Sequence, residues 1–388
     1  MPAGSHAELF AEVTALRGLA FRRPVAVELL GRVDFARRVR ASTVSSPHPS
    51  RALVARVFGL GPTRAASGGA SQERYVGLYD FVSHRLIVRG DAASEGRSRF
   101  DGIVAHELVH ALQDQHFGLI ADGASPDEAL AAEALYEGDA VLLRERLAAR
   151  RVGESEGTFL ARALGAIDAL PGATVARAVG ASQRVLGAPN DEREEALFPY
   201  LAGLRFVARL YEVGGTARID AAFRAPPTST MEILHPEAFL RGHKPRVLPE
   251  PPIPAGLVRE GGGSLGEFRT QLVASRCRKR ATLLGGLVGE RFVVGSSSAR
   301  PPQVTVPDAL AWVSLWETEE QAAAFRLALA EARRCLPGAA THDALEQHGR
   351  GVAFVRGAFG DRAAYAEGVA RTAHLGEPRA TSEAPAIR

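Results

Sequence analysis

His106 and His110 are separated by three residues, and Glu107 follows the first of them, in the order His-Glu-Leu-Val-His. Apolar residues recur at helical spacing around this segment, which predicts a helix from about Gly102 to Phe117. Because residues four apart lie on one face of a helix, both imidazoles can bind one cation while Glu107 lies beside it. The pattern favours hydrolysis: zinc lowers the pKa of a water molecule that it binds to about 7, and Glu107 accepts the proton as a general base.

A catalytic zinc ion needs a third protein ligand, and the sequence offers three candidates. Glu137, in Leu-Tyr-Glu-Gly-Asp-Ala on the next predicted helix, would reach the metal if the two helices were antiparallel. His116 fits the metzincin pattern HExxHxxGxxH, but this chain has Gln113 where that pattern needs a glycine to turn the chain back. Glu133, one helical turn before Glu137, could be the ligand or a partner of a ligand histidine, and Asp114 could be another such partner. We favour Glu137 and expect one zinc ion per chain.

Two residues are candidates for stabilising a developing oxyanion, a role that zinc hydrolases commonly give to a tyrosine or histidine outside the HExxH helix. Tyr200 and His235 stand in motif-like stretches well beyond the proposed ligands. Each also has a structural interpretation: Tyr200 as a core residue with a satisfied hydroxyl, and His235 with Pro236 as the cap of a turn.

Several stretches of the chain resemble bacterial and archaeal zincin-like zinc metallopeptidases, most of them uncharacterised. These stretches are Gly77-Leu-Tyr-Asp80, Val104-Ala-His-Glu-Leu-Val-His-Ala-Leu-Gln-Asp-Gln-His116, Leu135-Tyr-Glu-Gly-Asp-Ala140, Pro199-Tyr-Leu-Ala-Gly203, Pro227-Thr-Ser-Thr230 and Leu234-His-Pro236. The resemblance spans roughly residues 70 to 240. It implies a zincin-like α+β fold and a gluzincin-type third ligand at Glu137, because Leu-x-Glu-Gly-x-Ala is also similar to the gluzincin aminopeptidases. It implies a class of enzyme without a specific substrate.

The elements that must position these residues are a hairpin and three helices. Two aromatic and β-branched runs around a short turn, Tyr75–Asp80 and Arg85–Arg89, predict a β-hairpin just before the HExxH helix. A second helix is predicted from Pro126 to Arg151, where Ser125 caps the start in a capping box with Glu128, and a long third helix from Glu192 to Arg224. By the resemblance, the hairpin belongs to the sheet beside the active-site cleft, where its edge strand could bind an extended peptide.

The chain is predicted to contain two domains of α+β class. A zincin-like catalytic domain at residues 1–243 is followed by a Pro/Gly-rich linker at 244–263, a smaller α+β domain at 264–375 and a disordered tail at 376–388. In the smaller domain, strands are expected at residues 291–294 and 309–316 and a helix at 317–335.

Composition narrows the class of protein. Of the 388 residues, 46% are hydrophobic and 23% charged, as in ordinary soluble domains, and no apolar run is long enough for a transmembrane segment. The formal net charge is only +3 and the arginines are scattered, so we expect no nucleic-acid partner. Residues 1–21 lack the features of a signal peptide, which favours the cytoplasm by default, or export if a leader has been removed. The oligomeric state is not indicated.

The leading hypothesis is a zinc metallopeptidase that acts on peptide or protein substrates. Two other hypotheses use the same residues: a catalytically inactive zinc-stabilised scaffold or binding protein, and a hydrolase of non-peptide amides. The intact Glu107 argues against the scaffold, because a scaffold could dispense with the base. The motif does not separate peptides from other amides.

Overall fold

The computed structural model describes residues 3–43, 49–60, 76–118, 125–169, 190–276, 285–298, 307–338 and 342–374. The fold is mixed α+β and divides into two compact units. The first unit comprises residues 1–244 with 265–272, and the second comprises 245–264 with 273–388. Residues 265–272, which the sequence places in the C-terminal domain, therefore belong to the first unit.

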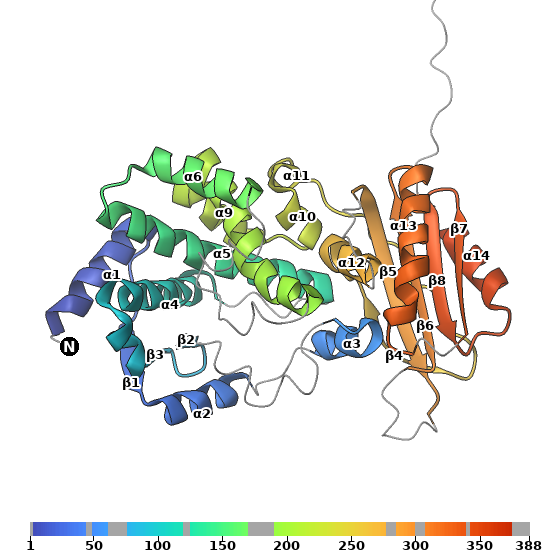
Figure 1. Ribbon diagram of the computed structural model, residues 1–388, viewed down its shortest axis with the longest axis horizontal. Coiled ribbons are helices and arrows are strands. Elements are labelled where there is room, and N and C mark those ends of the chain that lie inside the picture. The colour runs from blue at the N-terminus through green and yellow to red at the C-terminus, as the bar shows by residue number, and fades with distance from the viewer. Residues whose placement is uncertain are drawn as a thin grey trace, which may run out of the picture. The chain divides into compact units, whose positions relative to one another are not determined.

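The first unit is mainly helical (Figure 1). Its described elements are α1 (Ala3–Arg17), β1 (Ala26–Leu30), α2 (Arg32–Thr43), α3 (Pro49–Phe58), β2 (Gly77–Asp80), β3 (Arg85–Arg89), the 3-10 helix η2 (Gly90–Glu95), α4 (Arg97–Phe117), α5 (Pro126–Arg151), α6 (Glu156–Ala169), α9 (Asn190–Arg224), α10 (Thr230–Leu234) and α11 (Pro236–Leu240).

A small three-stranded sheet lies beside the helices, in the order β1-β3-β2. The antiparallel pairing of β2 with β3 confirms the predicted hairpin, and β1 adds to β3 in parallel. Successive side chains of a strand point to opposite faces. On β3, Leu86 and Val88 are buried in the core shared with α4, whereas Ile87 packs on Phe35 and Val39 of α2. The sheet is therefore held between α2 and α4 (Figure 1).

Helices α4 and α5 share one hydrophobic core, in which Val104 and Leu108 of α4 are buried with Ala140, Leu143 and Leu147 of α5. Helix α4 contains the predicted HExxH helix and begins five residues earlier than expected, at residue 97. The opposite side of α5 packs on α9 in a second core. Helix α5 thus lies between the HExxH helix and α9.

The ends of α5 agree with the sequence. Ser125 Oγ accepts a hydrogen bond from the Glu128 amide at 3.2 Å, and Glu128 Oε2 accepts one from the Ser125 amide at 2.9 Å, which confirms the capping box. The predicted long helix at 192–224 is α9, but it is interrupted at Gly214 and Gly215. Gly215 has a φ of 61°, a conformation that glycine adopts readily.

The second unit is built on a five-stranded antiparallel sheet in the order β4-β5-β6-β8-β7. Its described elements are β4 (Val258–Gly263), β5 (Leu287–Ser296), β6 (Ala309–Trp316), α13 (Glu319–Ala332), the 3-10 helix η3 (Arg333–Cys335), β7 (Asp343–His348), β8 (Gly351–Gly357) and α14 (Arg362–Thr372), and the end of α12 (Gly266–Ser275) belongs to it. The predicted strands at 291–294 and 309–316 lie in β5 and β6, and the predicted helix at 317–335 is α13 followed by η3.

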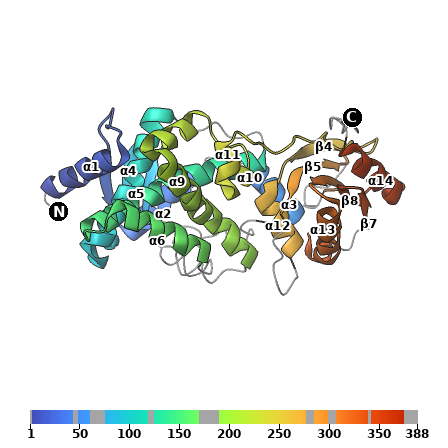
Figure 2. The ribbon, with the colours of Figure 1, turned by 90° about the horizontal axis from the view of Figure 1, so that it is seen from above.

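Helices α13 and α14 cover opposite faces of this sheet (Figure 1 and Figure 2). On β6, Trp312 and Trp316 pack on Phe325 of α13, and the alternate residues Ala311 and Val313 belong to the core that includes α14. The sheet extends into the segment interpreted as a linker, because β4 at residues 258–263 pairs with β5. The tail predicted to be disordered, 376–388, lies outside the described residues.

None of the described helices is both long enough and apolar enough to cross a membrane.

Candidate metal centre

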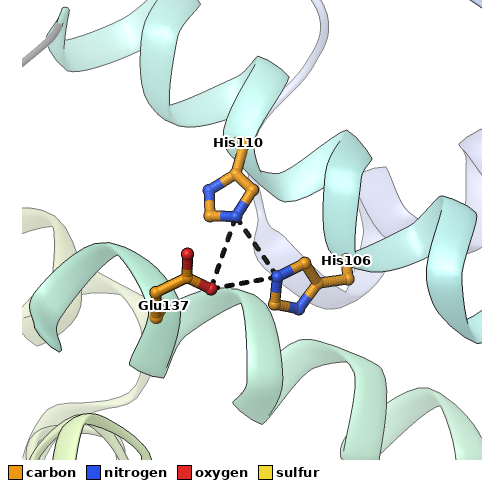
Figure 3. Close-up of side chains that lie close together, drawn as sticks. All are labelled: His106, His110 and Glu137. Atoms are coloured by element: carbon orange, nitrogen blue, oxygen red, sulfur yellow. Dashed lines mark hydrogen bonds and ion pairs between the residues drawn. The ribbon is translucent and has the colours of Figure 1, made fainter. Parts of the chain in front are cut away.

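The HExxH helix presents both histidines to one point. His106 and His110 are one turn apart on α4, and their Nε2 atoms are 3.2 Å from each other (Figure 3). The two rings are nearly perpendicular, with centroids 4.9 Å apart and an interplanar angle of 84°. The burial of Val104 and Leu108 against the sheet and α5 fixes the rotation of the helix that gives the histidines this direction.

Glu137 reaches the same point from α5 (Figure 3). Its Oε2 atom lies 3.1 Å from His106 Nε2 and 3.7 Å from His110 Nε2. Among the described residues, these three are the only group of at least three side chains whose potential ligand atoms gather within 4.8 Å. The structure therefore brings together the two histidines and the carboxylate that the sequence favours as third ligand.

The spacing of the three atoms fits a zinc ion. Atoms that bind zinc tetrahedrally at 2.0–2.1 Å lie about 3.3 Å from one another, close to the three separations found here. If a zinc ion binds here, His106 Nε2, His110 Nε2 and Glu137 Oε2 would hold it. Two imidazoles and a carboxylate are also a ligand set that catalytic zinc sites use.

The charges of the group favour a cation. Burial raises the pKa of Glu137, but hydrogen bonds and attraction from His106 and His110 outweigh it and hold that pKa far below its usual value. Burial lowers the pKa of His110, but the hydrogen bond and charge of Glu137, with smaller contributions from Glu107 and Gln113, raise it to about 9. Glu137 is thus anionic, and its charge, together with that of Glu107, stabilises a positive charge next to the two histidine Nε2 atoms.

Gln113 fixes the orientation of His110. The Gln113 amide nitrogen donates to Asp139 Oδ2 at 2.9 Å and to the Tyr136 carbonyl at 3.1 Å, so its oxygen is the acceptor for His110 Nδ1 at 2.8 Å. This hydrogen bond keeps the proton on Nδ1 and leaves the Nε2 lone pair for a metal. Asp139 is held in turn by an ion pair with the buried Arg17, at 3.0 Å.

His106 is supported differently. Its Nδ1 atom is buried and has no hydrogen-bond partner in the part of the chain that the structure describes. The buried chain of hydrogen bonds from Gln113 to Asp139 therefore orients His110, whereas the His106 ring contacts His110 and Glu137.

Glu107 lies beside the three candidate ligands and is not one of them. Its side chain is buried, with 9% exposed, and its Oε2 atom accepts a hydrogen bond from the Tyr79 amide of β2 at 2.7 Å. Gly77 lets the strand approach this carboxylate: a Cβ there would lie 2.9 Å from Glu107 Cγ and 2.7 Å from Ile103 Cγ2. Strand β2 thus fixes the position of the expected base.

The rival third ligands have other surroundings. His116 Nε2 lies 2.7 Å from the carbonyl of Ala20, in the segment after α1. Asp114 contacts the Tyr79 hydroxyl at 2.8 Å and His84 Nδ1 at 2.9 Å, so the partner of a ligand histidine is its neighbour Gln113 and not Asp114. Glu133 is half-buried on α5 and is not part of the group of three.

Tyr200 and His235 make contacts of a structural kind. Tyr200 is half-buried on α9 and packs against the core between α5 and α9. His235 ends α10, precedes α11, and forms an ion pair with Glu267 at 3.0 Å. These contacts agree with the structural interpretation of each residue, and the role of either as oxyanion donor stays a prediction.

A close helix crossing sets the position of Glu137. Gly138, the next residue, faces Gly203 of α9, and a Cβ on Gly138 would lie 2.3 Å from the Gly203 carbonyl carbon. A Cβ on Gly203 would in turn lie 2.2 Å from the carbonyl oxygen of Ala134. Both glycines stand in motifs of the sequence, but neither has a role that the sequence predicts. The signal that could have revealed this crossing is that each glycine lies inside a predicted helix. A glycine there lowers helix stability, so it suggests a place where another backbone comes close.

Comparison with models of protein families, with curated proteins and with solved structures found no match for this chain.

Proposed function

We propose that this chain is a zinc-dependent peptidase of zincin-like fold, in which His106, His110 and Glu137 bind one zinc ion and Glu107 is the general base. The observation that carries the proposal is the convergence of three ligand atoms from α4 and α5 at zinc-ligand spacing. The hairpin next to the HExxH helix and the ligand on the following helix support the gluzincin arrangement.

The chemistry divides between the ion and the chain. A bound zinc ion would supply a Lewis acid that acidifies water and polarises the scissile carbonyl. Glu107 would accept a proton from the attacking water at its carboxylate and deliver it to the leaving nitrogen. The Tyr79 amide holds this carboxylate in one orientation, so no reorientation is needed before proton transfer. Gln113 keeps His110 in the tautomer that binds metal.

The edge strand β2 supports a peptide as substrate. The Arg89 amide donates to the Val76 carbonyl, and pairs along an antiparallel ladder alternate. The backbone groups of Gly77 and Tyr79 therefore point away from β3, in agreement with the bond from the Tyr79 amide to Glu107. In the part of the chain that the structure describes, no other strand pairs with this edge of β2. The backbone groups on it that are not bonded to Glu107 could pair with an extended peptide and bring its backbone to the reacting groups.

The test is cleavage of a peptide library by the zinc-loaded chain, followed by mass spectrometry. We expect Glu107→Gln to keep its zinc and to lose at least about 100-fold in kcat/KM, because only the proton acceptor is removed. The matched control is Glu154→Gln, which breaks an exposed ion pair with Arg162 and should cleave like the wild type. Wild-type protein that holds zinc but cleaves nothing, or a Glu107→Gln variant that cleaves normally, would contradict the proposal.

A further inference from the structure

The turn between β2 and β3 places an aromatic side chain next to a candidate metal ligand. Phe81 is the first residue of this turn, and its ring centroid is 6.4 Å from that of His110, at 53°. The ring also packs edge-to-face on Tyr79, with centroids 5.0 Å apart. Phe81 is half-buried, so part of its side chain lies against the core and part is open to solvent beside the metal centre.

The turn is fixed at both ends. Asp80 Oδ1 accepts a hydrogen bond from the Val82 amide at 3.0 Å, and Asp80 Oδ2 accepts one from the Ser83 hydroxyl at 2.7 Å. His84 has a φ of 53° and is the only non-glycine residue in the described ranges with positive φ. A backbone conformation of this kind is unfavourable and persists only when its surroundings hold it, as the contact of His84 with Asp114 does here.

The same turn carries a second apolar side chain into solvent. Val82 follows Phe81 and is 80% exposed. Val82 thus contributes little to the core, whereas Phe81 packs on the core with one part of its side chain and leaves the rest as apolar surface. A rigid apolar surface beside the metal centre can bind an apolar group of a ligand.

We infer that Phe81 is a specificity-determining residue that contacts the substrate side chain next to the scissile bond and favours apolar and aromatic side chains there. The inference rests on the proposed function, because it takes the zinc ion as the point where the scissile bond binds. The substrate class is then a peptide that carries an apolar residue beside the bond cleaved, with its backbone along β2 and its side chain against the Phe81 ring.

The test is binding of two small zinc-directed ligands to the zinc-loaded chain, measured by calorimetry. Glycine hydroxamate and phenylalanine hydroxamate differ only in the side chain beside the zinc-binding group, and both are small enough to bind in either direction. We expect the wild type to prefer phenylalanine hydroxamate roughly tenfold, as an aromatic contact provides, and Phe81→Ala to reduce the preference below about threefold. Phe10→Ala is the matched control, because Phe10 is a half-buried aromatic residue that packs on Phe21, and it should keep the preference.

The outcomes separate the inference from the proposed function. Zinc-loaded wild type without a preference between the two ligands would overturn the inference alone. If Phe81→Ala lost its zinc, or weakened both ligands equally, Phe81 would position His110 and the inference would again be overturned. A wild type that binds no zinc would overturn the proposed function and the inference with it.

Discussion

Replacement of Gly77 by alanine should separate the role of Glu107 from metal binding. The new methyl group would lie 2.7 Å from Ile103 Cγ2 and 2.9 Å from Glu107 Cγ. Carbon atoms in contact are about 3.5–4.0 Å apart, so roughly 1 Å of movement must be shared between the strand and these side chains. Because Glu107 is tied to the same strand through the Tyr79 amide, we expect its carboxylate to be displaced.

The expected result is a loss of activity without a loss of zinc. A displacement of about 1 Å at a catalytic group can lower kcat/KM roughly 100-fold, and overpacking of this kind costs about 1–3 kcal/mol of stability. The assay is kcat/KM on a cleaved peptide, together with zinc content and thermal unfolding. Gly102→Ala on α4 is the matched control, because its methyl group would meet only Arg144, at 3.5 Å, and alanine favours a helix. A folded Gly77→Ala protein with activity within about threefold of the wild type would refute the reasoning.

The remaining predictions concern the ligands and their support. Gln113→Leu should weaken zinc binding about 10- to 100-fold in a chelator competition, because His110 loses the partner that fixes its tautomer, and unchanged affinity would contradict this. With its pKa near 9, His110 is protonated at pH 7 in the zinc-free chain, so zinc should displace about one proton per ion, measured by calorimetry in buffers of different ionisation enthalpy. The stability that protonated His110 gives the zinc-free chain is complete below its ordinary pKa of 6.5 and should be lost as the pH rises through about 9. Gly203→Ala should lower both the melting temperature and the zinc affinity, because its methyl group would lie 2.2 Å from the Ala134 carbonyl oxygen. In the control Gly157→Ala, the new methyl group would meet no atom within 4 Å, and neither quantity should change.

The sequence indicates the parts of the centre that depend on local spacing. His106 and His110 share a helix face whatever the rest of the chain does, and the capping box at Ser125 is a local pattern. The choice of Glu137 over His116 also followed from sequence, because Gln113 cannot replace the glycine that a metzincin turn requires. In the structure, α4 continues through Gln113 to Phe117.

What the sequence does not show depends on residues far apart in the chain. In the sequence, Gln113 is informative only because it stands where the metzincin pattern has a glycine. The fold places its side chain between His110 and Asp139, and the hydrogen bond to Asp139 forms only when α4 and α5 pack together. The contact of Gly77 with Glu107 requires the hairpin to lie against α4. After the break at Pro24 the sequence is compatible with either a helix or a strand, and the structure forms strand β1 there. Its pairing with β3 is a tertiary contact that strand propensity does not encode.

Composition also gave a wrong start for the C-terminal domain. Proline and glycine between residues 244 and 263 suggest a linker, but residues 258–263 form the edge strand β4 and carry glycines where other backbone comes close. A Cβ on Gly262 would lie 2.5 Å from the Phe292 carbonyl oxygen. Composition alone cannot separate a glycine needed for such a contact from a glycine of a flexible connection.

The most direct test of the proposed centre is the number of zinc ions per chain, by elemental mass spectrometry, in the purified wild type and in Glu137→Ala, Glu133→Ala and His116→Ala. We predict one zinc ion per chain in the wild type, in Glu133→Ala and in His116→Ala, and a loss of zinc in Glu137→Ala alone, because only Glu137 lies with the two histidines. A wild type without zinc, or a Glu137→Ala variant that binds zinc as well as the wild type, would contradict the assignment.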